Sequence, residues 1–377
     1  MKPLVSIITP SFNQGRFIQK TIDSVLSQNY ENLEYIIIDG GSTDNTHEIV
    51  SKFKDKLTYI SEKDNGQSDA INKGFRMAKG EIVAWLNSDD IYEPSCIARA
   101  VEEFEKNEKL GLVYGDGYII DENDNKLKIF EATQEFDLWT LVNVWDYIMQ
   151  PATFFRSKHL KEVGYVDVNL HWCMDWDLWI KLALVSDIKY VEEIFACSRE
   201  YGDTKTSTGG DKRLKEITAL MQKYSGIEKP LGIQLYKSST LYTKYANNWM
   251  SRKLYSRYMA YVHRKVFSNL PIRYADGWIG KKYSMIFGKN TRRITIELEA
   301  IYNLNLPCNI YIYINNKIRH KESISECVKK RLSLDIENNG TFNNIDIICD
   351  KIFTPSKDDK RKLSVKVISV NFQNEVF

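Results

Sequence analysis

The 377-residue sequence has no paired cysteines, no apolar leader and no long hydrophobic run. Its six cysteines are scattered without a C-x-x-C spacing, which argues against a zinc site and fits a reducing compartment. No apolar stretch reaches the roughly 18 residues that a membrane-spanning helix requires. The N-terminus turns polar too soon to act as a signal peptide. Together these absences predict a cytoplasmic protein.

The composition of the chain, with 43% hydrophobic and 27% charged residues, is that of a soluble globular protein. A chain of this length exceeds what one hydrophobic core usually serves. Because the pattern of residues changes near positions 211 and 290, we expect three parts, at residues 1–211, 212–290 and 291–377.

The net charge of +2 conceals a strongly basic segment. Residues 237–293 contain thirteen Lys or Arg and one acid, interleaved with aromatic residues, so the rest of the chain is acidic. Such a segment fits either a helical domain with an aromatic core and solvated cations, or a surface that binds anionic lipid. Single-stranded nucleic acid also suits these residue types, but no recognition motif accompanies them, and we expect no nucleic-acid partner.

The first 200 residues alternate short apolar runs with amphipathic helical patterns. Strands are predicted at residues 4–9, 34–39, 57–61 and 81–86, and helices at residues 17–26, 45–53, 69–78 and 95–104. This alternation predicts an α/β fold with a mostly parallel sheet covered on both faces. Ligands of such sheets bind at the carboxyl ends of the strands.

Past residue 211 the pattern changes twice. Residues 212–290 read as helical and strongly aromatic. From residue 291, apolar and polar residues alternate with period two in three runs, at residues 293–299, 310–314 and 363–370. Alternation without intervening helices predicts a small antiparallel β-sandwich.

Polar residues gather where the predicted strands end. The strongest cluster contains Asp89 and Asp90, since two adjacent carboxylates repel each other unless a cation or hydrogen-bond donors compensate. Carboxylate oxygens suit Mg or Mn, which can bridge to a diphosphate. The alternative is that both acids open a turn and cap the next helix. Asp39 has two interpretations as well: a turn residue, or an acceptor for a base or ribose.

A second acidic cluster, Asp175-Trp176-Asp177, lies at the start of a predicted apolar helix. An acid beside large apolar side chains becomes more basic through desolvation, which suits a general base. An N-cap role for Asp175 is the alternative. The polar residues 64–69 likewise fit either a solvated loop or part of a site.

Several different motifs follow one another along the chain in an informative order. They are Val5-Ser6-Ile7-Ile8-Thr9-Pro10-Ser11-Phe12-Asn13, Ile38-Asp39-Gly40-Gly41-Ser42-Thr43-Asp44, Gln67-Ser68-Asp69-Ala70-Ile71-Asn72-Lys73-Gly74, Leu86-Asn87-Ser88-Asp89-Asp90, Gln150-Pro151-Ala152-Thr153-Phe154-Phe155 and Asp175-Trp176-Asp177-Leu178-Trp179. In order and spacing, residues 3–206 resemble the inverting family 2 glycosyltransferases with the GT-A fold, which have a Rossmann-like mixed sheet.

The resemblance implies a metal-dependent hexosyltransferase or N-acetylhexosaminyltransferase that uses a nucleotide sugar, with UDP favoured by its frequency in the family. It implies Mn or Mg held by Asp90 and Asp89, and Asp175 as the catalytic base. The donor is expected to contact Thr9, Pro10, Phe12, Asp39, Asp69, Lys73, Asn87, Ser88, Asp89, Arg199 and Lys205.

Two positions depart from the family pattern. Ser88 stands where a full D-x-D metal motif has its first acid, as it does in many relatives. Arg199 and Lys205 resemble parts of a mobile loop that closes over the diphosphate. However, Glu200-Tyr201 follows Arg199 where the family often has His, which weakens the assignment of this loop.

The same resemblance implies an acceptor hydroxyl on a glycan or lipid-linked glycan, in bacterial surface polysaccharide or glycoconjugate synthesis. A lipid-binding surface at residues 237–293 would place the protein at the inner face of the cell membrane, and a homo-oligomer is left open. Phe353-Thr354-Pro355-Ser356 resembles part of a β-sandwich appended to some bacterial polysaccharide glycosyltransferases. A catalytically silent relative that binds sugar nucleotides or glycans is the alternative, but the expected acids are all present, which favours an active enzyme.

Overall fold

The computed structural model describes residues 2–202, 204–268, 270–271, 279–280, 282–287, 291–299, 308–315, 317–324, 329–336, 343–352, 361 and 363–374. The chain forms two compact units. The first comprises residues 1–137 and 146–217, and the second comprises residues 138–145 and 218–377.

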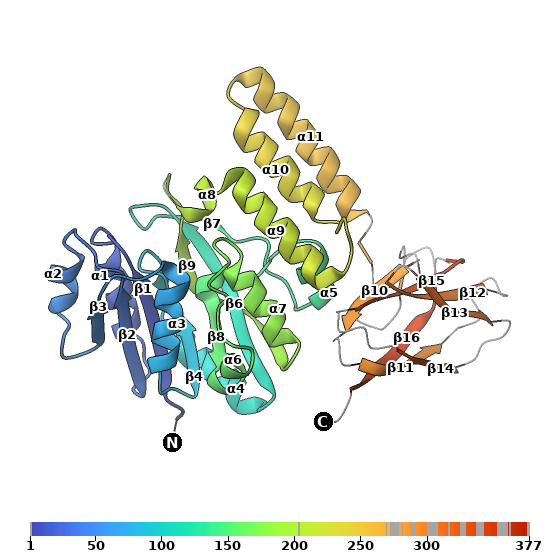
Figure 1. The fold of residues 1–377 in the computed structure, drawn as a ribbon, viewed down its shortest axis with the longest axis horizontal. Helices are drawn as coiled ribbons and strands as arrows, with labels where there is room; N and C mark the ends of the chain where they lie inside the picture. The colour runs from blue at the N-terminus through green and yellow to red at the C-terminus, as the bar shows by residue number, and fades with distance from the viewer. Residues whose placement is uncertain are drawn as a thin grey trace. The chain divides into compact units, whose positions relative to one another are not determined.

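A nine-stranded mixed sheet organises the first unit (Figure 1). Its strands run in the order β3 (Thr58–Ser61), β2 (Leu33–Asp39), β1 (Val5–Ser11), β4 (Ile82–Trp85), β8 (Thr153–Arg156), β6 (Leu110–Ile120), β9 (Asp187–Arg199) and β5 (Ile91–Tyr92), with β7 (Lys126–Ile129) beside β6. Strands β3, β2, β1 and β4 are parallel, as are β6 and β9, while β8 and β5 run against their neighbours. The predicted mixed α/β sheet is therefore confirmed.

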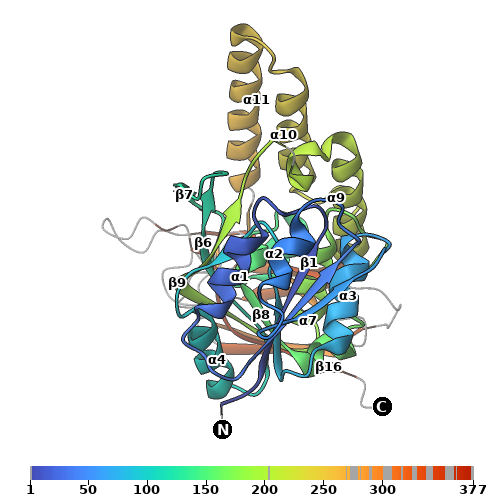
Figure 2. The same ribbon diagram turned by 90° about the vertical axis from the view of Figure 1, so that its left-hand side faces the viewer.

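Helices cover both faces of this sheet. They are α1 (Ile18–Leu26), α2 (Thr46–Ser51), α3 (Gln67–Met77), α4 (Cys96–Lys106), α6 (Ser157–Glu162) and α7 (Met174–Ala183), with a 3-10 turn η1 (Gln150–Ala152) before β8. After β9 the chain continues into α8 (Lys205–Thr208) and α9 (Gly210–Ser225), and the first unit ends within α9. Apolar residues of α1, α2 and α4 share one core with the strands, and α3 lies on the other face (Figure 2). On that other face, Trp179 of α7 stacks on Trp85 and Phe155, with ring centroids 5.8 and 5.4 Å apart.

The second unit combines helices with two small antiparallel sheets. Its helices are α5 (Leu138–Asn143), α10 (Ile233–Tyr245) and α11 (Trp249–Phe267). One sheet has the order β10 (Lys282–Phe287), β15 (Asn343–Cys349), β12 (Cys308–Ile314) and β13 (Lys317–Ile324); the other has the order β14 (Lys329–Asp335), β11 (Thr291–Glu299) and β16 (Lys366–Asn374). Alternate apolar side chains of both sheets fill one core, as the period-two runs predicted.

Three expectations about this part of the chain need comment. Residues 282–287 were predicted to be helical, but they form strand β10, because they pair with β15 in a sheet whose partner lies about 60 residues away. The residues 353–356 that resemble an appended β-sandwich lie outside the described residues. The boundary expected at residue 211 falls inside α9.

Within the described ranges, none of the helices combines the length and apolarity that crossing a bilayer demands.

Close packing of α3 on β1 makes a prediction about stability. A Cβ added at Gly74 would lie 2.4 Å from Ile8 Cγ2, well inside contact distance. We expect Gly74→Ala to lower the free energy of unfolding by about 1–3 kcal/mol, because overpacking outweighs the gain of up to about 1 kcal/mol that Ala has over Gly in helices. Urea denaturation measures this. Arg76→Ala, on the exposed side of α3, is the control and should stay within about 0.5 kcal/mol of the parent. Equal stability of the two variants would contradict the prediction.

Candidate functional site

The candidate site lies where neighbouring parallel strands end. β1 runs between β2 and β4, and Ser11 pairs with Asp39 in the register of β1 and β2. On the other side of β1, the Leu86 N–H donates to the Ile8 carbonyl, which keeps residues 86–90 beside the end of β1. Three polar segments therefore meet at one edge of the sheet, as the α/β pattern predicted.

Asp90 and Asp89 occupy the short connection from β4 to β5. The Asp90 side chain is 4% exposed; its Oδ1 accepts from the Arg199 backbone N–H at 2.9 Å and its Oδ2 from Asn87 Nδ2 at 3.1 Å. Burial, and then the charge of Asp89, raises the pKa of Asp90 to about 7. Asp89 accepts from the Tyr201 hydroxyl at 2.9 Å, and burial raises its pKa as well. The chain alone therefore leaves the ionised pair incompletely compensated.

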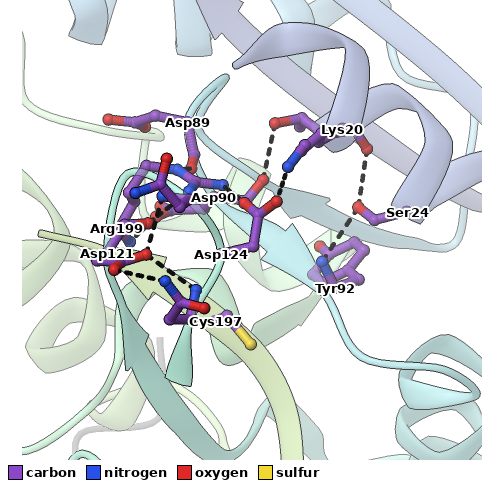
Figure 3. Close-up of polar contacts among 12 residues, drawn as sticks. Lys20, Ser24, Asp89, Asp90, Tyr92, Asp121, Asp124, Cys197 and Arg199 are labelled. Atoms are coloured by element: carbon purple, nitrogen blue, oxygen red, sulfur yellow. Dashed lines mark hydrogen bonds and ion pairs between the residues drawn. The ribbon is translucent and has the colours of Figure 1, made fainter. Parts of the chain in front are cut away.

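Arg199 holds the backbone around this acid pair (Figure 3). Its side chain is fully buried, and its guanidinium contacts Asp124 Oδ1 at 2.6 Å, the Asp121 carbonyl at 2.6 Å and the Asp89 carbonyl at 2.8 Å. The second carboxylate oxygen of Asp124 pairs with Lys20 of α1. One cation thus joins the acid pair, the turn between β6 and β7, and, through Asp124, helix α1.

In this structure Arg199 lies on a strand, and its expected place in a loop that closes over the diphosphate stays a prediction. Arg199 is the last residue of β9 and pairs with Ile120 in the parallel ladder with β6. A buried guanidinium must be compensated, and here the Asp124 carboxylate and the carbonyls of Asp89 and Asp121 supply the compensation. The sequence carried no signal for the contact with Asp124, which is 75 positions away.

Asp175 lies in the first turn of α7, one residue beyond the start of the helix. It is half-buried; its Oδ1 accepts from the Trp176 N–H at 2.8 Å, and burial raises its pKa. Asp177 faces elsewhere, 1% exposed and 3.2 Å from Lys181. Asp146, which sequence reasoning missed, interacts with Asp175: burial and then the charge of Asp175 raise the pKa of Asp146. Asp175 is thus an acid of increased basicity with part of its surface open.

Glu216 of α9 anchors the start of the helix that carries Asp175. Its carboxylate accepts from the backbone N–H groups of His171, Trp172 and Cys173 at 2.9, 2.6 and 2.7 Å. Donors at and before a helix N-terminus lack partners within the helix, and a carboxylate there also opposes the positive end of the helix dipole. No local pattern marks Glu216 for this role, because its partners lie more than 40 positions earlier.

A chain of polar side chains connects the two acidic regions. Lys205 Nζ donates to Gln67 Oε1 at 2.9 Å, and Gln67 Nε2 donates to Asn87 Oδ1 at 2.9 Å. Asn87 Nδ2 reaches both Asp90 and Gln150 Oε1, the latter at 2.8 Å. Burial lowers the pKa of Lys205, and the charge of Asp175 opposes that shift. Gln67 and Gln150 belong to motifs recognised in the sequence but had no assigned role there.

The structure uses Asp39 within the chain. Its fully buried carboxylate accepts from the backbone N–H groups of Gly41 and Ser42 and from the hydroxyls of Ser42 and Ser61. Three of these donors share Oδ2, and Oδ1 accepts from the Ser42 hydroxyl. Asp39 therefore orders the turn after β2, and its contact with a nucleoside stays a prediction.

The other residues expected to contact the donor divide into two groups. At the end of β1, Thr9 is fully buried with its hydroxyl 3.1 Å from that of Tyr35, and Pro10 is buried too, while Phe12 is 60% exposed. At this strand end Phe12 therefore offers a large surface to a ligand.

The second group lies on and near α3. Asp69 Oδ2 accepts from the Asn65 N–H at 3.1 Å and from the Asn65 side chain at 3.2 Å, which orders the loop before the helix. Lys73 forms an ion pair with Glu62. Ser88 is buried beside the acid pair. Asp69 and Lys73 thus stabilise their own surroundings in this structure.

The acid pair has the donor chemistry of a Mg or Mn site. Within the described part of the chain, no three His, Cys, Asp or Glu side chains gather closely enough to bind a metal. Mg, however, is commonly held by one or two carboxylates together with substrate phosphates and water. The Asp90 carboxylate accepts from the Arg199 N–H, Asn87 and Ser198, and of its roughly four acceptor positions one stays open. The residues present therefore fit a cation shared with a diphosphate.

Comparisons with known proteins agree with this geometry. Residues 6–162 match the family model described as Glycosyl transferase family 2. An uncharacterized glycosyltransferase of Rickettsia typhi is 31% identical over 247 residues, covering 63% of this chain and 76% of the relative. Chondroitin synthase of Pasteurella multocida is 29% identical over 216 residues, covering 56% of this chain and 22% of that protein.

Among solved structures, a mannosyltransferase of Pyrobaculum calidifontis in complex with GDP-Man and Mn²⁺ is similar, with a TM-score of 0.48 and 18% identity over 71% of this chain and 87% of that one. The sheet, the acids and these relatives define the class of protein as a glycosyltransferase. The chain belongs to glycosyl transferase family 2.

The anchoring of α7 predicts a role for the charge of Glu216. In Glu216→Gln the amide nitrogen would face a backbone N–H, so one of the donors of residues 171–173 loses its partner. We expect the free energy of unfolding to fall by about 1–3 kcal/mol. Thermal or urea unfolding measures this, and Lys215→Gln, at the exposed neighbouring position, is the control. If the two variants have the same free energy of unfolding, the hydrogen bonds from residues 171–173 to Glu216 do not contribute measurably to stability.

Proposed function

We propose that this chain transfers a sugar from a UDP-sugar to an acceptor hydroxyl with inversion at the anomeric carbon. The observation that carries the proposal is the hydrogen-bonded chain from Lys205 through Gln67 and Asn87 to Asp90. The charge of Lys205 also acts on Asp175. The acid expected to serve as base and the acid expected on the diphosphate side therefore belong to one polar cluster.

In the proposed reaction, Asp175 accepts the proton of the acceptor hydroxyl as that oxygen bonds to the anomeric carbon. The bond between this carbon and the diphosphate oxygen breaks with its electron pair, and the nucleoside diphosphate leaves. One displacement inverts the carbon and requires no nucleophile from the enzyme. Burial makes Asp175 more basic than an exposed aspartate, and the positive charges of Lys205 and Arg213 limit that shift.

We include Mn or Mg in the proposal, held by Asp90 and Asp89. When bound, such an ion would neutralise charge that develops on the departing diphosphate. The chain's own contribution is to hold Asp90 in place, through the Arg199 N–H and Asn87.

The acceptor that we propose is a glycan or lipid-linked glycan, and the transferred sugar is a hexose or N-acetylhexosamine. Similarity to the chondroitin synthases of Pasteurella multocida and Escherichia coli supports a role in bacterial surface polysaccharide or glycoconjugate synthesis. A lipid-linked acceptor implies a peripheral position at the inner face of the cell membrane.

The role of Asp175 is tested by Asp175→Asn, which keeps the size of the side chain and removes the base. We expect sugar transfer, followed as UDP release from a panel of UDP-sugars, to fall by about 10²–10⁴-fold, with UDP affinity unchanged. Asp177→Asn on the same helix is the matched control: it should lose stability with its Lys181 ion pair but keep its rate below its melting temperature. Near-parental transfer by folded Asp175→Asn would refute the assignment.

The role of Asp90 is tested by titration calorimetry with UDP, with and without Mn. For Asp90→Ala we expect the increase in affinity that Mn produces to disappear, while binding without Mn remains, because the carboxylate acts through the cation. Asp187→Ala, at the opposite end of β9, is the control and should retain the Mn effect. An undiminished Mn effect in Asp90→Ala would remove this residue as the ligand.

A further inference from the structure

Helix α11 has an apolar stripe along one side. Met250, Leu254, Tyr258 and Tyr261 recur at intervals of four, four and three residues, which aligns them on one helix face. Their exposed fractions are 72%, 65%, 41% and 61%. Large apolar side chains at these fractions are not part of a core, so this stripe is a surface of the described structure.

The opposite side of α11 packs on α10. Val262 and Val266 are buried there, and the two helices lie side by side in both views (Figures 1 and 2). Of the two interpretations of this segment, an aromatic core accounts for part of α10 and α11 but not for the stripe.

A row of cations borders the stripe. Lys253, Arg257 and Arg264 follow one another at helical spacing, and all three are exposed. None of them forms an ion pair within the described part of the chain. Trp249, 73% exposed, heads the row with Lys253 Nζ 5.0 Å from the centroid of its ring. Residues 233–267 contain seven Lys or Arg and no Asp or Glu, so no acid of these helices offsets the positive charge.

The combination of residues selects among partners. A second copy of α11 would bring two basic rows together, which like-charge repulsion opposes. A nucleic acid would pair with the cations and stack on the aromatic rings but would leave Met250 and Leu254 exposed to water. An anionic bilayer satisfies both parts, because acyl chains take up the aliphatic and aromatic side chains while headgroups face the cations.

We propose that α11 docks on an anionic lipid membrane. The surface involved, the docking face, consists of Trp249, Met250, Lys253, Leu254, Arg257, Tyr258, Tyr261 and Arg264. The stripe enters the boundary between headgroups and acyl chains, and the basic row contacts phosphate or other anionic headgroups. This inference rests on the proposed function, since the docked membrane would carry the lipid-linked acceptor.

Vesicle flotation with the full chain tests the docking face. We expect binding to vesicles that contain phosphatidylglycerol, little binding to vesicles of phosphatidylcholine alone, and weaker binding as salt is raised. Leu254→Glu/Tyr261→Glu should abolish binding. Lys253→Gln/Arg257→Gln should weaken it by about tenfold or more, since each cation near the bilayer contributes.

Lys237→Gln/Lys244→Gln on α10 is the matched control, because it removes the same charge from exposed positions outside the docking face. It should weaken binding much less than the pair on α11. The inference is overturned if both charge variants lose binding equally, or if the chain binds both kinds of vesicle equally. It is also overturned if Leu254→Glu/Tyr261→Glu retains binding, or if the parent chain does not bind.

The same preparations should be assayed for Mn-dependent UDP binding and for UDP release from UDP-sugars in the absence of vesicles. All variants carry substitutions at exposed positions, and we therefore expect them to fold. Retained UDP binding checks that they do. If the parent chain releases UDP but does not bind the vesicles, the docking face is refuted and the proposed function stands. If the parent chain binds the vesicles but does not bind UDP, the docking face stands and the proposed function is refuted.

Discussion

The burial of one guanidinium is the constraint on which the acidic site depends. A buried charge is tolerated only when it is paired and hydrogen-bonded, and the Arg199 side chain is fully buried. Asp124 supplies the opposite charge, and the carbonyls of Asp89 and Asp121 supply further acceptors. Because these groups come from separate segments, satisfying one side chain fixes the backbone that carries the acid pair. The backbone N–H of the same arginine then orients the Asp90 carboxylate.

Asp175, the acid that we propose as the base, is held by a similar arrangement at a different place. Glu216 satisfies three backbone donors at the start of α7, so the turn that carries Asp175 is tied to α9. The acid pair is tied to β9, and the Gln67–Asn87 pair bridges the two regions. Acids fixed by separate elements and joined by short polar contacts need little rearrangement to reach a reactive geometry, and such pre-organisation lowers the barrier to transfer.

Sequence reasoning succeeded where the signal was local or where motif order was informative. Periodicity located β1, β2 and β4, and motif order singled out Asp90 and Asp175 as the acids to examine. The contacts of Arg199 with Asp124, and of Glu216 with residues 171–173, join positions 40 to 75 apart that no local pattern relates. Strand β10 was misjudged for the same reason, because pairing with a distant strand overrides local helical preference.

The electrostatics of the site connect the acid pair with the proposed donor. Burial raises the pKa of both Asp89 and Asp90, and the arginine beside them is already paired with Asp124. A nucleoside diphosphate brings further negative charge to this edge of the sheet, where partial burial strengthens repulsion. Added positive charge between carboxylate and phosphate relieves both repulsions at once. With a cation bound, an acid pair that otherwise opposes diphosphate binding would become its means of recognition, which is why the cation and the donor belong to a single proposal.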